Sequence, residues 1–303
     1  MKCPFHGSLV ALPTPFRQDE IDFGTLQHLI DWHVDAKSDG VVVAGTSGEA
    51  ATLTDYERRS LIHAAVECSR RRIPVIAGIG TNNTAQSVDL ARFAASAHAD
   101  GLLAVTPYYN KPTQRGLIAH YGAIAEASPL PLVLYNVPGR TGVDLKAETV
   151  AECGRRFPTV AAIKESSGSV GRAKQLRELT DVALIAGEDH LIAEFMGLGA
   201  VGVIGVVANV APAQVAELCR VARPGGDPVR AAELSAWLAP LVRDLFLETN
   251  PVPVKAALAA MRRCSADVRL PLVPLEPANQ EQLMATLHEA GLLQHESRGR
   301  KST

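Results

Sequence analysis

The feature that most constrains the fold is a set of eight short apolar runs, rich in Val and Ile, that recur along the first two thirds of the chain. The runs are continuous rather than alternating in polarity, which is the pattern of parallel strands covered on both faces. Segments with helical spacing lie between them, one after Asp22 as a helix cap and one after a capping box at Thr54. The runs are Leu9-Val-Ala-Leu, Val41-Val-Val-Ala, Val75-Ile-Ala-Gly-Ile, Leu102-Leu-Ala-Val, Leu132-Val-Leu-Tyr, Val160-Ala-Ala-Ile, Val182-Ala-Leu-Ile and Val201-Gly-Val-Ile-Gly-Val-Val.

Eight repeated units of one strand and one helix predict an α/β fold, a closed (β/α)8 TIM barrel. An open, doubly wound sheet is the alternative, because periodicity alone does not prove closure. The strand pattern stops after Pro212, and helices are expected over 234–246, 254–261 and 279–292. We therefore expect a barrel over 1–224 and a C-terminal helical extension over 225–303, ending in a mobile polar tail from 294.

Composition excludes several classes of function. The 303 residues carry a formal net charge of −2 and no long basic run, so a nucleic-acid partner is not expected. No apolar stretch is long enough to span a membrane, and the N-terminus lacks the apolar run of a signal peptide. The five cysteines are scattered and form no CxxC pair, which is typical of a cytoplasmic protein without structural zinc.

The active site of a parallel barrel forms at the carboxyl ends of its strands. The groups that follow the runs here include one amine, several hydroxyls and phenols, and one guanidinium. They contain no carboxylate pair of the glycosidase kind and no clustered histidines, so we expect neither a metal nor another cofactor. His190 stands alone and is interpreted as structural. The strings are Gly45-Thr-Ser-Gly-Glu, Thr106-Pro-Tyr-Tyr-Asn, Tyr135-Asn-Val-Pro-Gly-Arg, Ile163-Lys-Glu and Gly187-Glu-Asp-His.

Lys164 ends a run that reads as a buried strand. A buried lysine loses its proton readily, and the neutral amine is a nucleophile that forms Schiff bases with carbonyl substrates. The alternative is an ion pair with Glu165 or a helix carboxylate. Glu165 should face the other way, however, because neighbours on a strand point to opposite sides.

With these strings in place, the chain resembles the dihydrodipicolinate synthase family of the pyruvate-dependent class I aldolase superfamily, which includes N-acetylneuraminate lyase. The resemblance spans most of the chain, from about residue 7 to residue 293. The matching strings are Gly45-Thr-Ser-Gly-Glu-Ala-Ala-Thr-Leu, Thr106-Pro-Tyr-Tyr-Asn-Lys-Pro, Tyr135-Asn-Val-Pro-Gly-Arg-Thr-Gly, Ile163-Lys-Glu and Asn250-Pro-Val-Pro-Val-Lys. The last of them has no obvious chemistry and is interpreted as structural.

The resemblance implies a role for each catalytic residue. Lys164 would form the Schiff base with pyruvate, and Tyr135 would act as the general acid and base. Thr46 would relay protons between Tyr135 and Tyr109. Tyr109 would reach into the neighbouring subunit, so that a dimer is the minimal catalytic unit and a homotetramer the expected assembly.

It also implies how the substrates are held. Thr46 and Ser47 would bind the pyruvate carboxylate, and Gly187 and Ile204 would line the site through their backbone. Arg140 would bind the carboxylate of L-aspartate 4-semialdehyde in a two-pronged contact. The product would be 4-hydroxy-tetrahydrodipicolinate, an intermediate of lysine and diaminopimelate biosynthesis.

The regulatory positions depart from lysine-inhibited members of the family. Gln86 replaces a glutamate that would pair with the effector's ammonium, and Arg58 adds a like charge nearby. We therefore expect weak or absent lysine feedback. The matching positions are Ala50, Ala51, Asp55, Arg58, Asn82, Gln86 and Tyr108.

Two alternatives remain open at this point. An aldolase for a 2-keto sugar acid such as N-acetylneuraminate would share Lys164 and Tyr135, although Arg140 favours the synthase. A non-catalytic, pyruvate-binding barrel would share the fold without the chemistry.

Overall fold

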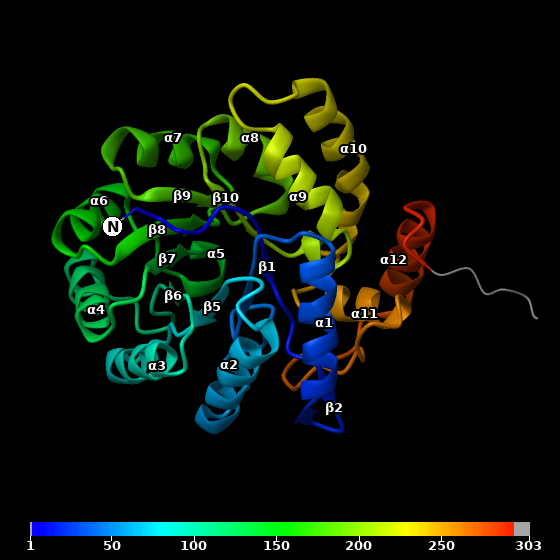
Figure 1. The fold of residues 1–303 in the computed structure, drawn as a ribbon, viewed down its shortest axis with the longest axis horizontal. Coiled ribbons are helices and arrows are strands. Elements are labelled where there is room, and N and C mark those ends of the chain that lie inside the picture. The colour runs from blue at the N-terminus through cyan, green and yellow to red at the C-terminus, as the bar shows by residue number, and fades with distance from the viewer. Residues whose placement is uncertain (1, 294–303) are drawn as a thin grey trace, which may run out of the picture.

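The computed structural model describes residues 2–293. Eight parallel strands close into a barrel in the order β1-β10-β9-β8-β7-β6-β5-β4, with helices around the outside (Figure 1). Pairing of β1 with β10 completes the ring and rules out the open sheet. The strands are β1 (Gly7–Ala11), β4 (Gly40–Val43), β5 (Val75–Gly78), β6 (Gly101–Val105), β7 (Leu132–Asn136), β8 (Val160–Glu165), β9 (Ala183–Ala186) and β10 (Gly202–Gly205).

All eight apolar runs are therefore strands of the barrel, as predicted. Each is buried because its inner side chains fill the barrel and its outer side chains pack against helices. The side chains that fill the barrel interior include Leu9, Val42, Ile76, Leu103, Val133, Ala162, Ile185 and Ile204. The sequence did not reveal a small hairpin, β2 (Phe16–Arg17) and β3 (Glu20–Ile21), which follows β1.

The helices that alternate with the strands begin largely as the caps predict. Asp22 accepts from the backbone of Thr25 at the start of α1, and Thr54 forms a complete capping box with Glu57 at the start of α2. The helices of this part are α1 (Phe23–Asp35), α2 (Asp55–Ser69), α3 (Thr84–Ser96), α4 (Gln114–Ala127), α5 (Pro138–Thr141), α6 (Ala147–Arg156), α7 (Val170–Leu179), α8 (Ile192–Gly197) and α9 (Pro212–Val221), with short 3-10 turns η1 (Asp189–Leu191) and η2 (Val207–Asn209).

Three further helices form the predicted C-terminal extension on the right of Figure 1, and the last of them packs against the other two. They are α10 (Pro228–Asp244), α11 (Val252–Ala260) and α12 (Pro277–Glu289). The predicted start of α10 at 234 was wrong, because Asp227 caps the helix and Pro228 takes its first turn. The boundary at 224/225 stays a prediction, and the expected tail from 294 lies outside the described residues.

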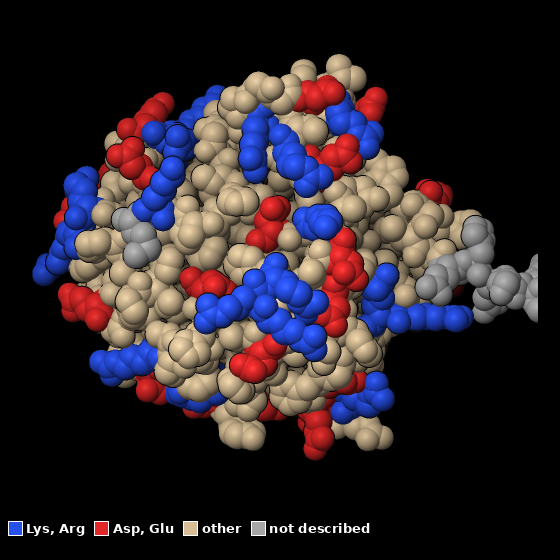
Figure 2. Space-filling view, viewed as in Figure 1, with Lys and Arg blue, Asp and Glu red and all other residues tan. Residues whose placement is uncertain are grey.

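Charged side chains of both signs are interspersed on the face drawn in Figure 2. Within residues 2–293, no helix has the length and apolar character needed to cross a membrane.

Candidate active site

The central pair of the site is set by strand register. Tyr135 on β7 lies directly opposite Lys164 on β8, so both side chains face the barrel interior. The register shifts between Leu132 and Val133; without that irregularity Tyr135 would pair with Ile163, which faces outward. Because a slip of one residue turns a side chain to the other face, the irregularity brings phenol and amine together.

The next pair along the same two strands faces outward and is purely structural. Asn136 donates to both carboxylate oxygens of Glu165, at 3.3 and 3.1 Å, and Arg172 Nε lies 3.5 Å from that carboxylate. The alternative partner for Lys164, its neighbour Glu165, is therefore engaged on the opposite face. Lys164 Nζ instead lies 4.2 Å from the centroid of the Tyr135 ring.

Lys164 is 6% exposed and lines a small cavity of about 50 Å³ at the mouth of the barrel. A lysine is costly to bury without a partner, so this position favours a chemical role over a packing role. The structure gathers seven of the predicted catalytic and substrate-binding residues around this cavity. They are Thr46, Ser47, Tyr135, Arg140, Lys164, Gly187 and Ile204.

The loop after β4, residues 45–49, supplies the hydroxyls of Thr46 and Ser47 to the wall of this small cavity. Ala44 and Glu49 take positive φ angles of 53° at either end, which turns the loop back toward the barrel. Gly78 of β5 permits the turn, because a Cβ there would lie 2.2 Å from the Ala44 carbonyl oxygen. Thr14 Oγ1 donates to the Gly48 carbonyl oxygen at 2.6 Å and holds the loop from the other side.

Residues just before and within α11 also hold this loop, a role the sequence did not reveal. Asn250 Nδ2 donates to Ser47 Oγ at 2.9 Å, and Lys255 Nζ lies 2.6 Å from Glu49 Oε1 in a fully buried ion pair. The string Asn250-Pro-Val-Pro-Val-Lys was the available signal, since it combines a polar residue and a lysine with apolar neighbours in one short segment.

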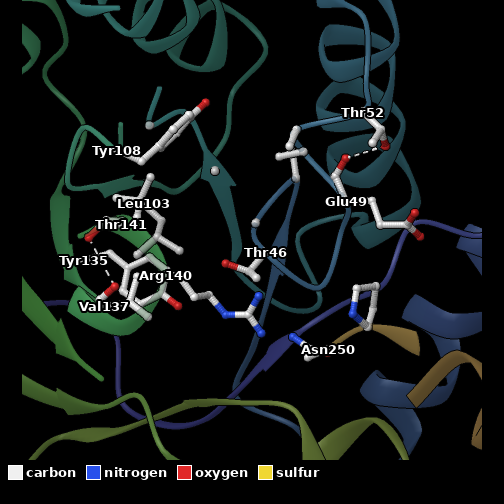
Figure 3. A pocket seen from close by; sticks show the side chains of 18 of the residues that line it. Thr46, Glu49, Thr52, Leu103, Tyr108, Tyr135, Val137, Arg140, Thr141 and Asn250 are labelled. Carbon is white, nitrogen blue, oxygen red and sulfur yellow. Dashed lines mark hydrogen bonds between the residues drawn. The ribbon is translucent and has the colours of Figure 1, made fainter. Parts of the chain in front are cut away.

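Arg140 stands in α5, two residues after the proline that begins this helix. It is exposed, and its guanidinium reaches across the pocket toward Thr46 and Asn250 (Figure 3). Nη1 donates to Thr249 Oγ1 at 3.4 Å, which leaves further N–H groups for a ligand. A guanidinium in this place can bind a carboxylate with two parallel hydrogen bonds.

Gly187 and Glu188 bring the end of β9 into the same cavity. A Cβ at Gly187 would lie 2.8 Å from the Glu165 carbonyl oxygen, so the chain can pass there only as glycine. Glu188 was not singled out from the sequence. Burial raises the pKa of its carboxyl, and the positive charge of Lys164 opposes that rise.

A larger cavity of about 330 Å³ adjoins the first and shares Thr46, Tyr135, Arg140 and Asn250 with it. Arg58 is buried in its wall, and its Nε and Nη2 donate to the Gly78 carbonyl oxygen at 3.0 and 2.7 Å. Burial lowers the pKa of Arg58 to about 10, so it is still a cation at neutral pH. The predicted regulatory residues in this wall are Ala50, Ala51, Arg58 and Tyr108.

The remaining predicted residues lie outside both cavities of the single chain. Asp55 pairs with Arg59, the Asn82 carbonyl accepts from Asn110, and Gln86 is exposed. Tyr109 is 88% exposed and takes a φ of 73°, unusual for a residue with a bulky side chain. No group of three or more His, Cys, Asp or Glu side chains within 2–293 is arranged to hold a metal ion.

The comparisons with known proteins agree in pointing to one family. The Dihydrodipicolinate synthetase family matches residues 4–290. A 4-hydroxy-tetrahydrodipicolinate synthase from Persephonella marina is 46% identical over 293 residues, which cover 95% of this chain and 99% of the relative.

Solved structures of similar proteins superpose over almost the whole chain. Dihydrodipicolinate synthase from Aquifex aeolicus has a TM-score of 0.94 and 41% identity, covering 96% of this chain and all of that one. The chloride-inhibited dihydrodipicolinate synthase from Acinetobacter baumannii, complexed with pyruvate, has a TM-score of 0.93 and 43% identity, covering 95% of this chain and all of that one.

Proposed function

Because the chain belongs to the dihydrodipicolinate synthetase family, we propose that it condenses pyruvate with L-aspartate 4-semialdehyde to 4-hydroxy-tetrahydrodipicolinate, through a Schiff base on Lys164. The reaction serves lysine and diaminopimelate biosynthesis. The observation that carries the proposal is the inward-facing pair of Tyr135 and Lys164 in a cavity that also contains hydroxyls and a guanidinium.

The Lys164 amine attacks the ketone carbon of pyruvate, and loss of water leaves a protonated imine. The imine withdraws electrons, so a methyl proton leaves and an enamine forms. Tyr135, against the amine, is the group placed to donate and accept these protons. The enamine carbon then attacks the aldehyde, and the substrate's own amine displaces Lys164 as the ring closes.

The remaining roles follow the position of each group. Thr46 and Ser47 hold the pyruvate carboxylate beside Lys164, while Gly187 and Ile204 line the same cavity. Arg140 stands at the opening and binds the carboxylate of the second substrate. No cofactor is needed for this chemistry, because the imine itself stabilises the carbanion.

The assembly and its location are parts of the same proposal. Tyr109 projects from the surface at a strained backbone position, which supports its entry into the site of a partner subunit. It would meet Thr46 there and extend the proton path to solvent. A homotetramer built from two such dimers follows, and the free cysteines among the described residues fit the reducing cytoplasm.

The substrate assignment is tested by turnover with purified enzyme. We expect pyruvate with aspartate semialdehyde to be consumed, and N-acetylneuraminate to be cleaved slowly or not at all. Cleavage of sugar acids at the higher kcat/KM would assign the chain to the aldolase alternative. Pyruvate binding without turnover of either substrate would assign it to the non-catalytic alternative.

A further inference from the structure

Two segments about two hundred residues apart in sequence meet beside the cavity that contains Lys164. The hydrogen bond from Asn250 reaches Ser47, and the ion pair of Lys255 reaches Glu49, so both contacts fall on the loop 45–49. We propose that Asn250 is a positioning residue that fixes the direction of the Ser47 hydroxyl for binding the pyruvate carboxylate. This proposal rests on the function proposed above.

The hydroxyl of Ser47 can both donate and accept hydrogen bonds. A hydroxyl has one hydrogen to donate, and its oxygen can accept from other groups. Ser47 Oγ accepts from Asn250 Nδ2 at 2.9 Å, and across residues 2–293 it donates to no protein acceptor. Both residues are buried, at 1% and 6% exposure, so bulk water does not compete for the bond. The hydrogen of Ser47 is thereby left for an acceptor in the cavity.

The acceptor that the chemistry supplies is a carboxylate. Ser47 and Asn250 both line the cavity that contains Lys164. An amide that donates to the hydroxyl oxygen polarises the O–H bond and strengthens the next hydrogen bond in the chain. Asn250, Ser47 and the carboxylate of pyruvate would then form one donor chain, each oxygen accepting from the group before it.

The ion pair at the other end of the loop keeps this geometry in place. Lys255 and Glu49 are fully buried, and Glu49 Oε2 also accepts from the backbone N–H of Arg269 at 3.0 Å. Figure 3 shows the Glu49 carboxylate directed away from Thr46 and Arg140, and Glu49 does not line the small cavity that contains Lys164, so its carboxylate supports the loop. The Glu49 backbone N–H donates to the Thr46 carbonyl oxygen at 3.1 Å, which ties the pair to the hydroxyl-bearing residues.

A double-mutant cycle tests the proposal, with the KM for pyruvate as the readout. Asn250→Ala and Ser47→Ala should each raise this KM about 10- to 100-fold, the loss expected for one hydrogen bond to a charged group. The double variant should be no worse than Ser47→Ala, because Asn250 acts through Ser47. Ser47→Thr keeps the hydroxyl and should retain most of the affinity.

Two further variants separate positioning from general damage. Asn250→Asp offers only acceptor oxygens, so it would take the hydrogen of Ser47 and should raise the KM for pyruvate more than Asn250→Ala does. Asn279→Ala removes another asparagine side chain near the C-terminal end of the described chain. That side chain donates to Glu248, and neither residue lines either cavity, so the KM for pyruvate should stay unchanged.

The failure of this inference is distinct from the failure of the proposed function. If wild-type enzyme turns over pyruvate but the two alanine effects add in the double variant, Asn250 does not act through Ser47 and the inference is wrong. An unchanged KM for pyruvate in Asn250→Ala overturns it too. Should Asn250→Ala unfold, Asn250→Asp takes its place. Its KM for pyruvate should rise as that of Ser47→Ala does, and an unchanged KM in Asn250→Asp overturns the inference. A wild-type enzyme that forms no adduct with pyruvate would instead overturn the proposed function.

Discussion

The small cavity lined by Lys164 and the larger cavity lined by Arg58 share a wall, but they differ in whether their charged side chains already have partners. Within residues 2–293 Lys164 forms no ion pair with a carboxylate, and its amine lies against the Tyr135 ring in its cavity. In the larger cavity Arg58 already donates to backbone carbonyls, and Glu49 is neutralised by Lys255. A charged residue in a cavity wall is thus available for a ligand only where the fold has not already paired it.

The largest change should come from the phenol of the smaller cavity. Tyr135→Phe keeps the ring that lies against Lys164 but removes the proton donor, so we expect kcat to fall by about 10²- to 10⁴-fold, the range of general acid–base catalysis. Tyr56→Phe, on an exposed tyrosine of α2, is the matched control and should behave as wild type. A kcat within a few-fold of wild type for Tyr135→Phe would remove Tyr135 from the mechanism.

A change at the shared wall should affect the second substrate alone. Arg140→Ala removes the two-pronged contact to a carboxylate, so we expect the KM for aspartate semialdehyde to rise about 10- to 100-fold. The KM for pyruvate should stay the same, because the proposed function assigns the pyruvate carboxylate to Thr46 and Ser47. Steady-state kinetics with each substrate varied in turn checks this. Equal increases in both KM values would mean that Arg140 supports the whole site and does not select one substrate.

The barrel could be predicted well from the sequence, because each of its strands has a pattern that lies within a few consecutive residues. Each strand is buried on both faces, so each appears as one continuous apolar run, and Lys164 stands at the end of such a run. The hairpin of β2 and β3 was missed because strands of two residues leave no periodic pattern. The early start of α10 was missed because the predicted helix began only at 234, although Asp227 and Pro228 are residues that cap and begin a helix.

The site was predictable only as far as residue types at strand ends reveal it. The outward pairing of Asn136 with Glu165 and the irregular register on β7 depend on how neighbouring strands align, which no single strand encodes. The contacts of Asn250 and Lys255 join residues more than two hundred positions apart. Hydrogen bonds of this kind have no sequence period and become visible only in the folded chain.

Acid pH should destabilise the fold through the protonation of a buried histidine that lines neither cavity. Burial of His33 in α1 lowers the pKa of its ring to about 3, below the value of 6.5 in an unfolded chain. The unfolded state therefore binds more protons between these values, and the free energy of unfolding falls as the pH drops through this window, by up to about 1.4 kcal/mol per pH unit.

The matched variants are His33→Gln, which removes the titrating group, and His6→Gln, at an exposed histidine. Denaturant unfolding at several pH values should show a shallower acid slope for His33→Gln only. The experiment also shows whether the acid limit of stability is set outside both cavities. Equal slopes for His33→Gln and wild type would show that His33 does not set the acid limit.

The smallest expected effect concerns the larger cavity. Arg58 keeps a positive charge in its wall, and Gln86, which lies outside it in the single chain, brings no carboxylate, so an ammonium-bearing effector should bind weakly. Turnover should stay constant across a lysine titration matched in ionic strength with NaCl. Strong inhibition at sub-millimolar lysine would contradict the proposed loss of feedback, and would mean that assembly of the subunits completes a site that the single chain lacks.

The most direct measurement of the central claim is borohydride reduction of the enzyme in the presence of pyruvate, followed by peptide mass spectrometry. The account predicts a mass gain of one reduced pyruvate on the peptide that contains Lys164. Lys174→Ala, on an exposed lysine of α7, should show the same gain, and Lys164→Ala should show none. An unmodified Lys164 peptide in wild-type enzyme, or an adduct on another lysine, would contradict the mechanism.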